Sequence, residues 1–448
     1  MPINFLGVFV GLTLSIILIV FKLNPVSAMF LGTVVGSLLG GASLHEMLWQ
    51  IIIPGVESVT GIIIRIIAGG VLAGVLIESG AAESIARSIV TKLGDRNALL
   101  ALALSSMILL AVGIFLPVSV VILAPIALSV AHKAGISKLS AILALSGGGK
   151  AGNLISPNPN TISAAEAFDL PLGDLMIQGF IPALAALLAT VILANLLKNK
   201  GFRVKDKDLE TQSQLPIPRK ESRKLPAHIK ANVDVSRAVE KELPPFSKAI
   251  TAPLVAIILL LLKPVGDFFD IGFLSQLSLD SFIVLPIGAV TGMLVMGKGN
   301  RCLEFINKGI TRMAPVVLML VGAGALTGLI RNSVMPELII TSMNYLGIPM
   351  IFIAPISGAV MGAATGSAAT GVIIAGPSFA NILLAEGIPA LSAAIMIHAG
   401  AALFDIVPHG NYFLASKDSM KVGMLDRLKV IPYEALIGLF MVTVTIFL

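Results

Sequence analysis

Long apolar runs recur along this chain of 448 residues, and most of them extend over 16 to 25 residues. A helical run of that length matches the hydrocarbon core of a bilayer, whereas membrane-spanning strands show alternation over about ten residues. Hydrophobic residues make up 56% of the chain and charged residues only 12%, about half the charged fraction that is usual in soluble proteins. The sequence therefore predicts an all-α polytopic membrane protein.

We expect five spans on each side of a polar segment. The predicted spans are 3–21, 25–41, 57–79, a broken span at 138–165 and 173–197, then 249–263, 280–297, 313–330, a broken span at 389–416 and 430–448. The first run lacks a positively charged start, so it is interpreted as a retained span and not as a cleaved signal. The stretches 97–133 and 346–385 each have a polar centre and are predicted to be re-entrant hairpins, with two full spans each as the open alternative.

A basic linker separates the two halves. Residues 198–248 contain 13 Lys/Arg, 7 Asp/Glu and few large apolar side chains, so this segment is not expected to fold alone. The predicted division is a first membrane repeat at 1–197, the linker at 198–248 and a second membrane repeat at 249–448.

An internal repeat relates the halves. Gly70, Gly74 and Glu83 recur 254 residues later, and Pro125, Gly148 and a Leu-Ser-Ala run starting at Leu139 recur 252 residues later. Pro157 and Asn160 recur at Pro408 and Asn411, 251 residues later. Because five crossings per half is an odd number, the two repeats are predicted to be inverted relative to one another, as in many secondary transporters.

The distribution of charge predicts the orientation. With the linker in the cytoplasm, most of the 31 Lys/Arg residues, including Arg427, fall in cytoplasmic loops, whereas Lys263 and Arg331 are external. This agrees with the positive-inside rule and places both termini outside a cytoplasmic membrane. The net charge of +6 therefore reflects membrane topology, and we expect no nucleic-acid partner.

The stretch from Ser146 to Thr161 is the strongest candidate for a site. It contains four glycines and two prolines, which disfavour a continuous helix. Irregular backbone at membrane depth survives only where protein buries it or where it lines a cavity. Helix ends in such a break attract carboxylates, while Asn and Thr side chains bind hydroxyl groups.

Charged residues inside the predicted spans are the next candidates, because intramembrane charge costs roughly 2.5–3.5 kcal/mol per residue. Arg65 is interpreted either as a substrate contact or as half of a structural ion pair. Lys150 is interpreted as a cation for a carboxylate, with neutralisation of helix-end carbonyls as the alternative. Asp405, His398 and His409 lie in the second broken span and can change protonation, although a membrane histidine can also simply be a packed hydrogen-bonding group.

The remaining candidates are small polar side chains. Those at the tip of the second hairpin could instead serve close helix packing. The predicted substrate-binding set is Lys150, Asn153, Ser156, Asn158, Asn160, Thr161, Thr365, Ser367, Thr370, Asn411 and Arg65, and the predicted proton-coupling set is Asp405, His398 and His409.

The sequence contains no motif for a disulfide framework, a metal site, a phosphate-binding loop or a catalytic set. The single cysteine, Cys302, excludes a disulfide framework, and no metal-ligand spacing or phosphate-binding loop is present. No nucleophile, base and orienting residue form a set, so we expect neither an enzyme nor a cofactor other than the proton as coupling ion.

The stretch from Gly147 to Thr161, the segment Ala364–Thr370 and the segment His398–Asn411 together resemble the gluconate/proton symporters of the ion transporter superfamily. The resemblance extends over nearly all of both halves but not over the linker. It implies proton-driven uptake of gluconate or a related sugar acid, by an elevator-type or rocking motion.

The functional hypothesis is a proton-coupled symporter for a small hydroxylated carboxylate. A cation/proton antiporter using Asp405, without an organic substrate, is the alternative. We expect a small organic anion and the lipid bilayer as partners, with a homodimer left open.

Overall fold

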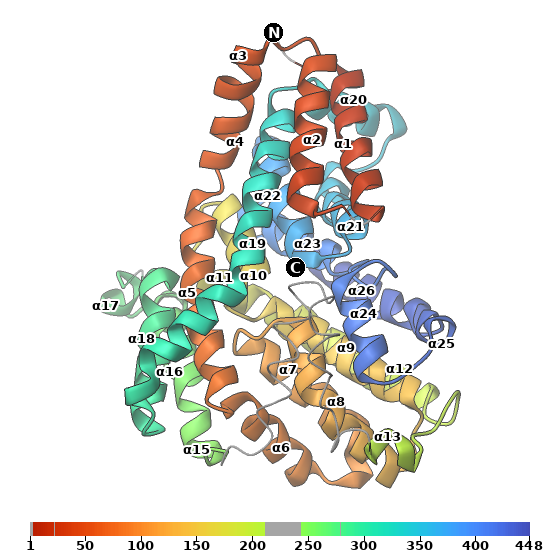
Figure 1. Ribbon diagram of the computed structural model, residues 1–448. Helices are drawn as coiled ribbons and strands as arrows, with labels where there is room; N and C mark the ends of the chain where they lie inside the picture. Colours follow the sequence, from red (N-terminus) through yellow and green to blue (C-terminus); the bar gives the residue numbers. More distant parts are fainter. Residues whose placement is uncertain (1–2, 22, 211–242, 278) are drawn as a thin grey trace.

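The computed structural model describes residues 3–21, 23–210, 243–277 and 279–448 (Figure 1). Over these residues the chain forms helices and only isolated bridge contacts between extended residues, so the predicted all-α class is confirmed. The first half contains α1 (Phe5–Val20), α2 (Pro25–Leu39), α3 (Leu44–Glu46), η1 (Met47–Ile52), α4 (Ile53–Glu57), α5 (Thr60–Glu78), α6 (Ala81–Leu93), η2 (Asp95–Asn97), α7 (Ala98–Ala111), α8 (Leu116–Lys133), α9 (Lys138–Leu154), α10 (Pro159–Ala167), α11 (Leu172–Gln178), α12 (Phe180–Leu196) and α13 (Asp206–Glu210).

The second half repeats this order with a similar spacing. It contains α15 (Phe246–Ala249), α16 (Thr251–Phe268), α17 (Gly272–Ser275), α18 (Ser281–Val295), η3 (Gly299–Arg301), α19 (Cys302–Arg331), α20 (Met335–Leu346), η4 (Met350–Phe352), α21 (Ile353–Thr365), α22 (Ala368–Ala385), α23 (Ala390–Ala401), α24 (Asn411–Ser419), α25 (Met424–Leu428) and α26 (Ile431–Ile446).

By length and composition, six helical segments in the described part of the chain can cross a membrane, or eight if each of two bent pairs counts as one span. The predicted spans at α1, α2 and α18 are apolar but shorter, at 16, 15 and 15 residues. The full set of ten crossings therefore stays a prediction.

Helices α5 and α19 cross the molecule beside each other and pack closely (Figure 1). The predicted span at 313–330 is too short, because α19 already begins at Cys302. Its first turns are polar, and they contain an ion pair of 2.9 Å between Glu304 and Lys308 at the favourable i,i+4 spacing. Lys308 and Arg312 also bind Glu78 at the end of α5, at 2.9 and 2.7 Å, which joins the two helices.

The glycine run at 147–149 does not break the helix, contrary to the expectation from composition. Helix α9 continues to Leu154, and the break comes at residues 155–158. Each helical glycine costs about 1 kcal/mol relative to alanine, but here the missing side chain allows close approach. A Cβ atom at Gly148 or Gly152 would overlap the backbone carbonyl of Ala103 or Met107 on α7.

The two described ends of the basic linker dock onto the helices. Asp208 of α13 forms a 3.0 Å ion pair with Lys138 at the start of α9, and the Lys421 ammonium donates to the Asp208 carbonyl. At the other end, the Ser84 hydroxyl of α6 donates to the Pro244 carbonyl at 2.6 Å. The expectation that the linker does not fold alone falls mainly on residues 211–242, which lie outside the described residues.

Candidate functional site

Two helix breaks form the centre of the candidate site. The first, residues 155–158, separates α9 from α10, and the second, residues 402–410, separates α23 from α24. Both predicted broken spans are therefore interrupted. Each break contains a proline, Pro157 in the first and Pro408 in the second, and proline disfavours helical backbone in the residue before it.

The polar side chains of the first break bind one another. The side-chain NH₂ group of Asn158 donates to the backbone carbonyl of Asn153 at 3.1 Å. The side-chain oxygen of Asn158 accepts from the backbone N–H groups of Asn160 and Thr161 at 2.8 and 3.2 Å. The Thr161 hydroxyl also donates to the Asn153 carbonyl at 3.1 Å. These three side chains are buried, and so are Ser156, which donates to the Leu110 carbonyl, and Asn160. In this conformation the network caps α10 and holds the break in shape.

Lys150 of α9 and Asp405 of the second break form the central contact of the candidate site. The ammonium group lies 2.6 Å from Oδ1 of Asp405 and also donates to the Ala402 carbonyl. The side chains are 0% and 6% exposed, so the pair is almost completely removed from solvent. Both interpretations of Lys150 from the sequence therefore apply to the same atom: it faces a carboxylate, and it neutralises a helix-end carbonyl. Removing one partner from such a buried pair costs about 3–5 kcal/mol, because the other charge is left uncompensated.

The tip of the hairpin formed by α21 and α22 lies against the second break. Gly366 has a φ of +63°, and a Cβ atom there would come within 2.7 Å of the Gly410 Cα atom. Glycine is therefore required at this turn for both backbone conformation and space. The tip residues Thr365 and Ser367 are half-buried, and Thr370, whose N–H group bonds the Ser367 hydroxyl at 3.4 Å, is buried.

The N-terminus of α24 differs from that of α10, because no side chain caps it. His409 and Asn411, on either side of this end, are exposed. Uncapped N–H groups at a helix N-terminus attract anions. The candidate residues around the first break are therefore buried, as are Asp405 and Thr370. An accessible group around the second break and the hairpin tip consists of His409, Asn411, Thr365 and Ser367.

His398 lies on α23, completely buried, and neither ring nitrogen has a hydrogen-bond partner among the described residues. The structure thus does not place it in the Lys150–Asp405 contact. Its position in the candidate coupling set remains an expectation from the sequence.

Arg65 has two carboxylate partners that the sequence did not identify. Its guanidinium lies 2.6 Å from Glu166 at the end of α10 and 2.7 Å from Asp280 at the start of α18. The three side chains are 28–40% exposed. Sequence proximity could not reveal these contacts, since Asp280 lies 215 residues away along the chain.

A second buried ion pair was also missed. Arg427, expected in a cytoplasmic loop, is 0% exposed and binds Glu434 of α26 through two hydrogen bonds of 2.8 Å. The available signal was Glu434 itself, an acidic residue inside the apolar run 430–448.

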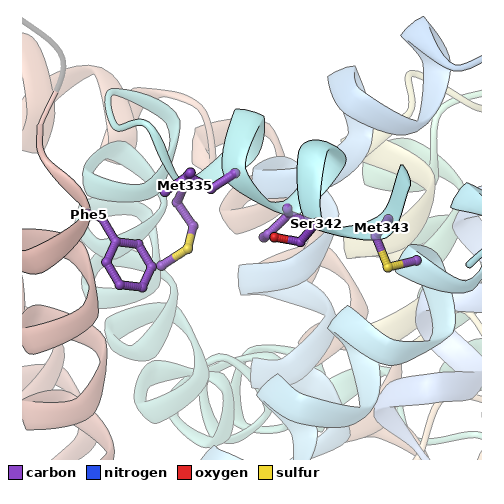
Figure 2. A pocket seen from close by; sticks show the side chains of 6 residues that line it. Phe5, Met335, Ser342 and Met343 are labelled. Atoms are coloured by element: carbon purple, nitrogen blue, oxygen red, sulfur yellow. The ribbon is translucent and has the colours of Figure 1, made fainter. Parts of the chain in front are cut away.

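A surface cavity lies elsewhere. It has a volume of about 270 Å³, opens widely, and is lined by Phe5 of α1 and by α20 residues including Met335, Ser342 and Met343 (Figure 2). Its lining is almost entirely apolar and contains none of the candidate residues. We therefore place the candidate site at the breaks and not in this cavity.

The fold and the two broken helices define a class, the polytopic α-helical membrane proteins with interrupted helices. Solved structures with a similar fold are the YdaH transporter of Alcanivorax borkumensis, with a TM-score of 0.52, 15% identity and coverage of 90% of this chain and 88% of that one, and MtrF of Neisseria gonorrhoeae, with a TM-score of 0.53, 14% identity and coverage of 97% and 94%. Within this class the chain belongs to the GntP permease family, whose match extends over residues 3–448.

Curated relatives agree with this membership. An uncharacterised transporter of Haemophilus influenzae is 43% identical over 98% of this chain and 96% of its own length. A high-affinity gluconate transporter of Escherichia coli K12 is 23% identical over 90% of each chain, and the D-serine transporter DsdX of E. coli O6:H1 is 25% identical over 91% of this chain and 90% of its own. The resemblance to gluconate permeases is confirmed, and the family is one of permeases and not of enzymes.

Proposed function

We propose that this chain is a symporter that couples the uptake of gluconate, or a related small hydroxy acid, to an inward flow of protons. The observation that carries the proposal is the buried contact between Lys150 of α9, the helix before the first break, and Asp405 of the second break. The cation/proton antiporter is not favoured, because the family includes relatives named as gluconate and D-serine transporters, which carry organic solutes.

Charge balance at Lys150 suggests how coupling arises. One ammonium group can compensate one buried carboxylate, and at present that carboxylate belongs to Asp405. A substrate carboxylate can replace it only if Asp405 becomes neutral, which requires a proton. Each monovalent anion would then travel with one proton, and the occupied site would have the same net charge as the empty one.

The accessible group provides the expected approach for substrate. The uncapped start of α24 offers N–H donors for a carboxylate, and Asn411, Thr365 and Ser367 offer partners for hydroxyl groups. Because Lys150 is fully buried here, substrate reaches it only after the Lys150–Asp405 pair separates.

The proposal includes an inverted repeat, and reciprocal glycine contacts support it. A Cβ atom on Gly55 would overlap the Gly324 carbonyl, and one on Gly309 would overlap the Gly70 carbonyl. Gly55 and Gly309 are 254 residues apart, as are Gly70 and Gly324. Two such contacts, exchanged between halves, are what a two-fold relation between α4–α5 and α19 would produce.

One arm of each predicted hairpin is short, which supports a re-entrant path for that arm, whereas the other arms, α8 and α22, have 18 residues and are long enough to cross a membrane. Helices α7 and α21 have 14 and 13 residues, which correspond to about 20 Å at 1.5 Å per residue. The hydrocarbon core is about 30 Å thick. We also propose the orientation with both termini outside and the linker cytoplasmic, on the basis of the Lys/Arg distribution.

Transport by purified protein in liposomes tests the function. The substrate panel is gluconate, other sugar acids, glycerate and D-serine, each with and without an inward proton gradient at clamped membrane potential. We expect accumulation of at least one hydroxy acid only when the gradient is present. Accumulation that ignores the gradient, or no uptake of any compound by protein that remains folded, would refute the proposal.

A further inference from the structure

Arg427 is buried more completely than an arginine normally is. It lies on α25, is 0% exposed, and makes a two-bond contact of 2.8 Å per bond with Glu434 of α26. Its Nε atom donates to the Ser416 hydroxyl of α24 at 2.8 Å, and its guanidinium lies 4.8 Å from the centre of the Phe413 ring. One side chain thus ties α24 to α26.

The packing of these helices does not require charge. Replacing a buried ion pair by apolar residues is often neutral or stabilising, because desolvation of the ions is costly. At the repeat offset of 252 residues, Arg427 and Ser416 correspond to Leu175 and Ala164. At the offset of 251 they correspond to Met176 and Ala165, and all four of these residues are buried and apolar.

Glu434 follows the same pattern. Its counterparts in the first half are Pro182 or Ala183, which are buried. At the equivalent positions of α10, α11 and α12, the first half therefore has apolar, buried residues. The charged set exists only in the half that contains Asp405.

The charged set acts on Asp405. Lys150 contacts the Asp405 carboxylate directly at 2.6 Å, whereas Arg427 and Glu434 act on it only through space and, having opposite charges, in opposite directions. Tyr412 of α24 is buried and also interacts electrostatically with Asp405. Because Ser416 is on α24, the helix that follows the second break, the Arg427 contact limits how far that break can move.

We propose that Arg427, Glu434 and Ser416 are positioning residues that hold α24 and the second break so that Asp405 stays in register with Lys150. Their effect on uptake rests on the proposed symport, whereas their effect on Asp405 itself does not. They touch no substrate. They set the geometry and the local charge balance in which the Asp405 carboxyl gains and loses its proton.

The test uses a triple variant, Ser416→Ala with Arg427→Leu and Glu434→Leu, which gives the second half the apolar character of the first. The control is Asp426→Asn, which removes an exposed ion pair with Lys429 from the same helix. Infrared titration of the Asp405 carboxyl band, assigned by its loss in Asp405→Asn, is the readout that a purely structural role would leave unchanged. Thermal melting and proton-driven uptake are measured on the same preparations.

We expect the triple variant to melt near the parent temperature, its Asp405 band to titrate about one pH unit or more away from the parent, and its uptake to fall about tenfold or more. An unchanged titration together with an unchanged pH profile of uptake overturns the inference. If the triple variant does not fold, Arg427→Lys decides, because it keeps the charge but loses the two-bond fork and the Ser416 contact. If the parent transports nothing in the panel, the proposed function fails, and the infrared titration still decides the positioning role.

Discussion

Replacing Asp405 by Asn separates anion binding at Lys150 from proton binding at Asp405, the two parts of the proposed coupling. Asn cannot carry charge, so Lys150 keeps the Ala402 carbonyl but loses its carboxylate at 2.6 Å. The substrate carboxylate then has no competitor for the ammonium group, and no proton needs to bind. We expect the variant to carry the anion alone.

The expected accumulation of substrate follows from the single carboxyl group, Asp405, at the Lys150 contact. In the parent, one proton per anion makes transport electroneutral, so a one-unit inward pH gradient supports about tenfold accumulation at equilibrium and voltage has no effect. In the variant the anion moves with its charge. A potential of 100 mV, negative inside, then opposes entry by about 2.3 kcal/mol, which corresponds to about a 50-fold exclusion.

Proteoliposomes loaded with potassium and treated with valinomycin measure both quantities, because the pH gradient and the voltage can be set separately. Asp418→Asn is the matched control, since Asp418 lies on α24 and its side chain is 65% exposed. Tenfold accumulation by Asp405→Asn under a pure pH gradient would refute the reasoning, and so would a parent whose uptake follows voltage.

Three further outcomes are expected. Lys150→Ala should abolish uptake with expression intact. Adding Asp405→Asn to this variant should restore thermal stability but not uptake, because the uncompensated buried carboxylate is then gone. Unchanged affinity for substrate in Lys150→Ala would exclude Lys150 as a substrate-binding residue. Gly148→Ala should lower the melting temperature despite the better helix propensity of alanine, because the added Cβ atom overlaps a carbonyl of α7. The control Gly272→Ala, with open space around the residue, should not lower it. Equal melting temperatures of the two variants would contradict the packing argument. Burial opposes ionisation of Asp208, but hydrogen bonds from a backbone N–H and a lysine ammonium outweigh it and hold the pKa of Asp208 below its usual 3.8. The docked linker end should therefore resist proteolysis at neutral pH and become sensitive only as the pH falls below about 3.8 and through the lowered pKa. An onset of cleavage near pH 6 would show that another group controls docking.

Much of the architecture was accessible from composition and periodicity. The length of the apolar runs determined the all-α membrane class, because only helices and closed barrels satisfy backbone hydrogen bonds in lipid. Interruptions within the spans 138–165 and 389–416 were predicted, because glycine and proline act locally on the backbone. Asp405 and Lys150 were both identified, since a charge within an apolar run is costly wherever it finally lies.

Tertiary structure decided what those residues do. The glycines of α9 predicted a break, yet they are helical because α7 and α12 approach them closely, and that approach involves residues far away in sequence. The pairing of Lys150 with Asp405, 255 residues apart, and of Arg65 with Glu166 and Asp280 could not be read from spacing. Arg427 looked like a loop cation because its sequence neighbourhood is polar, and only the packing of α24, α25 and α26 around it removes it from water. The sequence thus identified charged residues that lie within apolar runs, because their cost is local. Their ion-pair partners were decided only by contacts between segments far apart in the sequence.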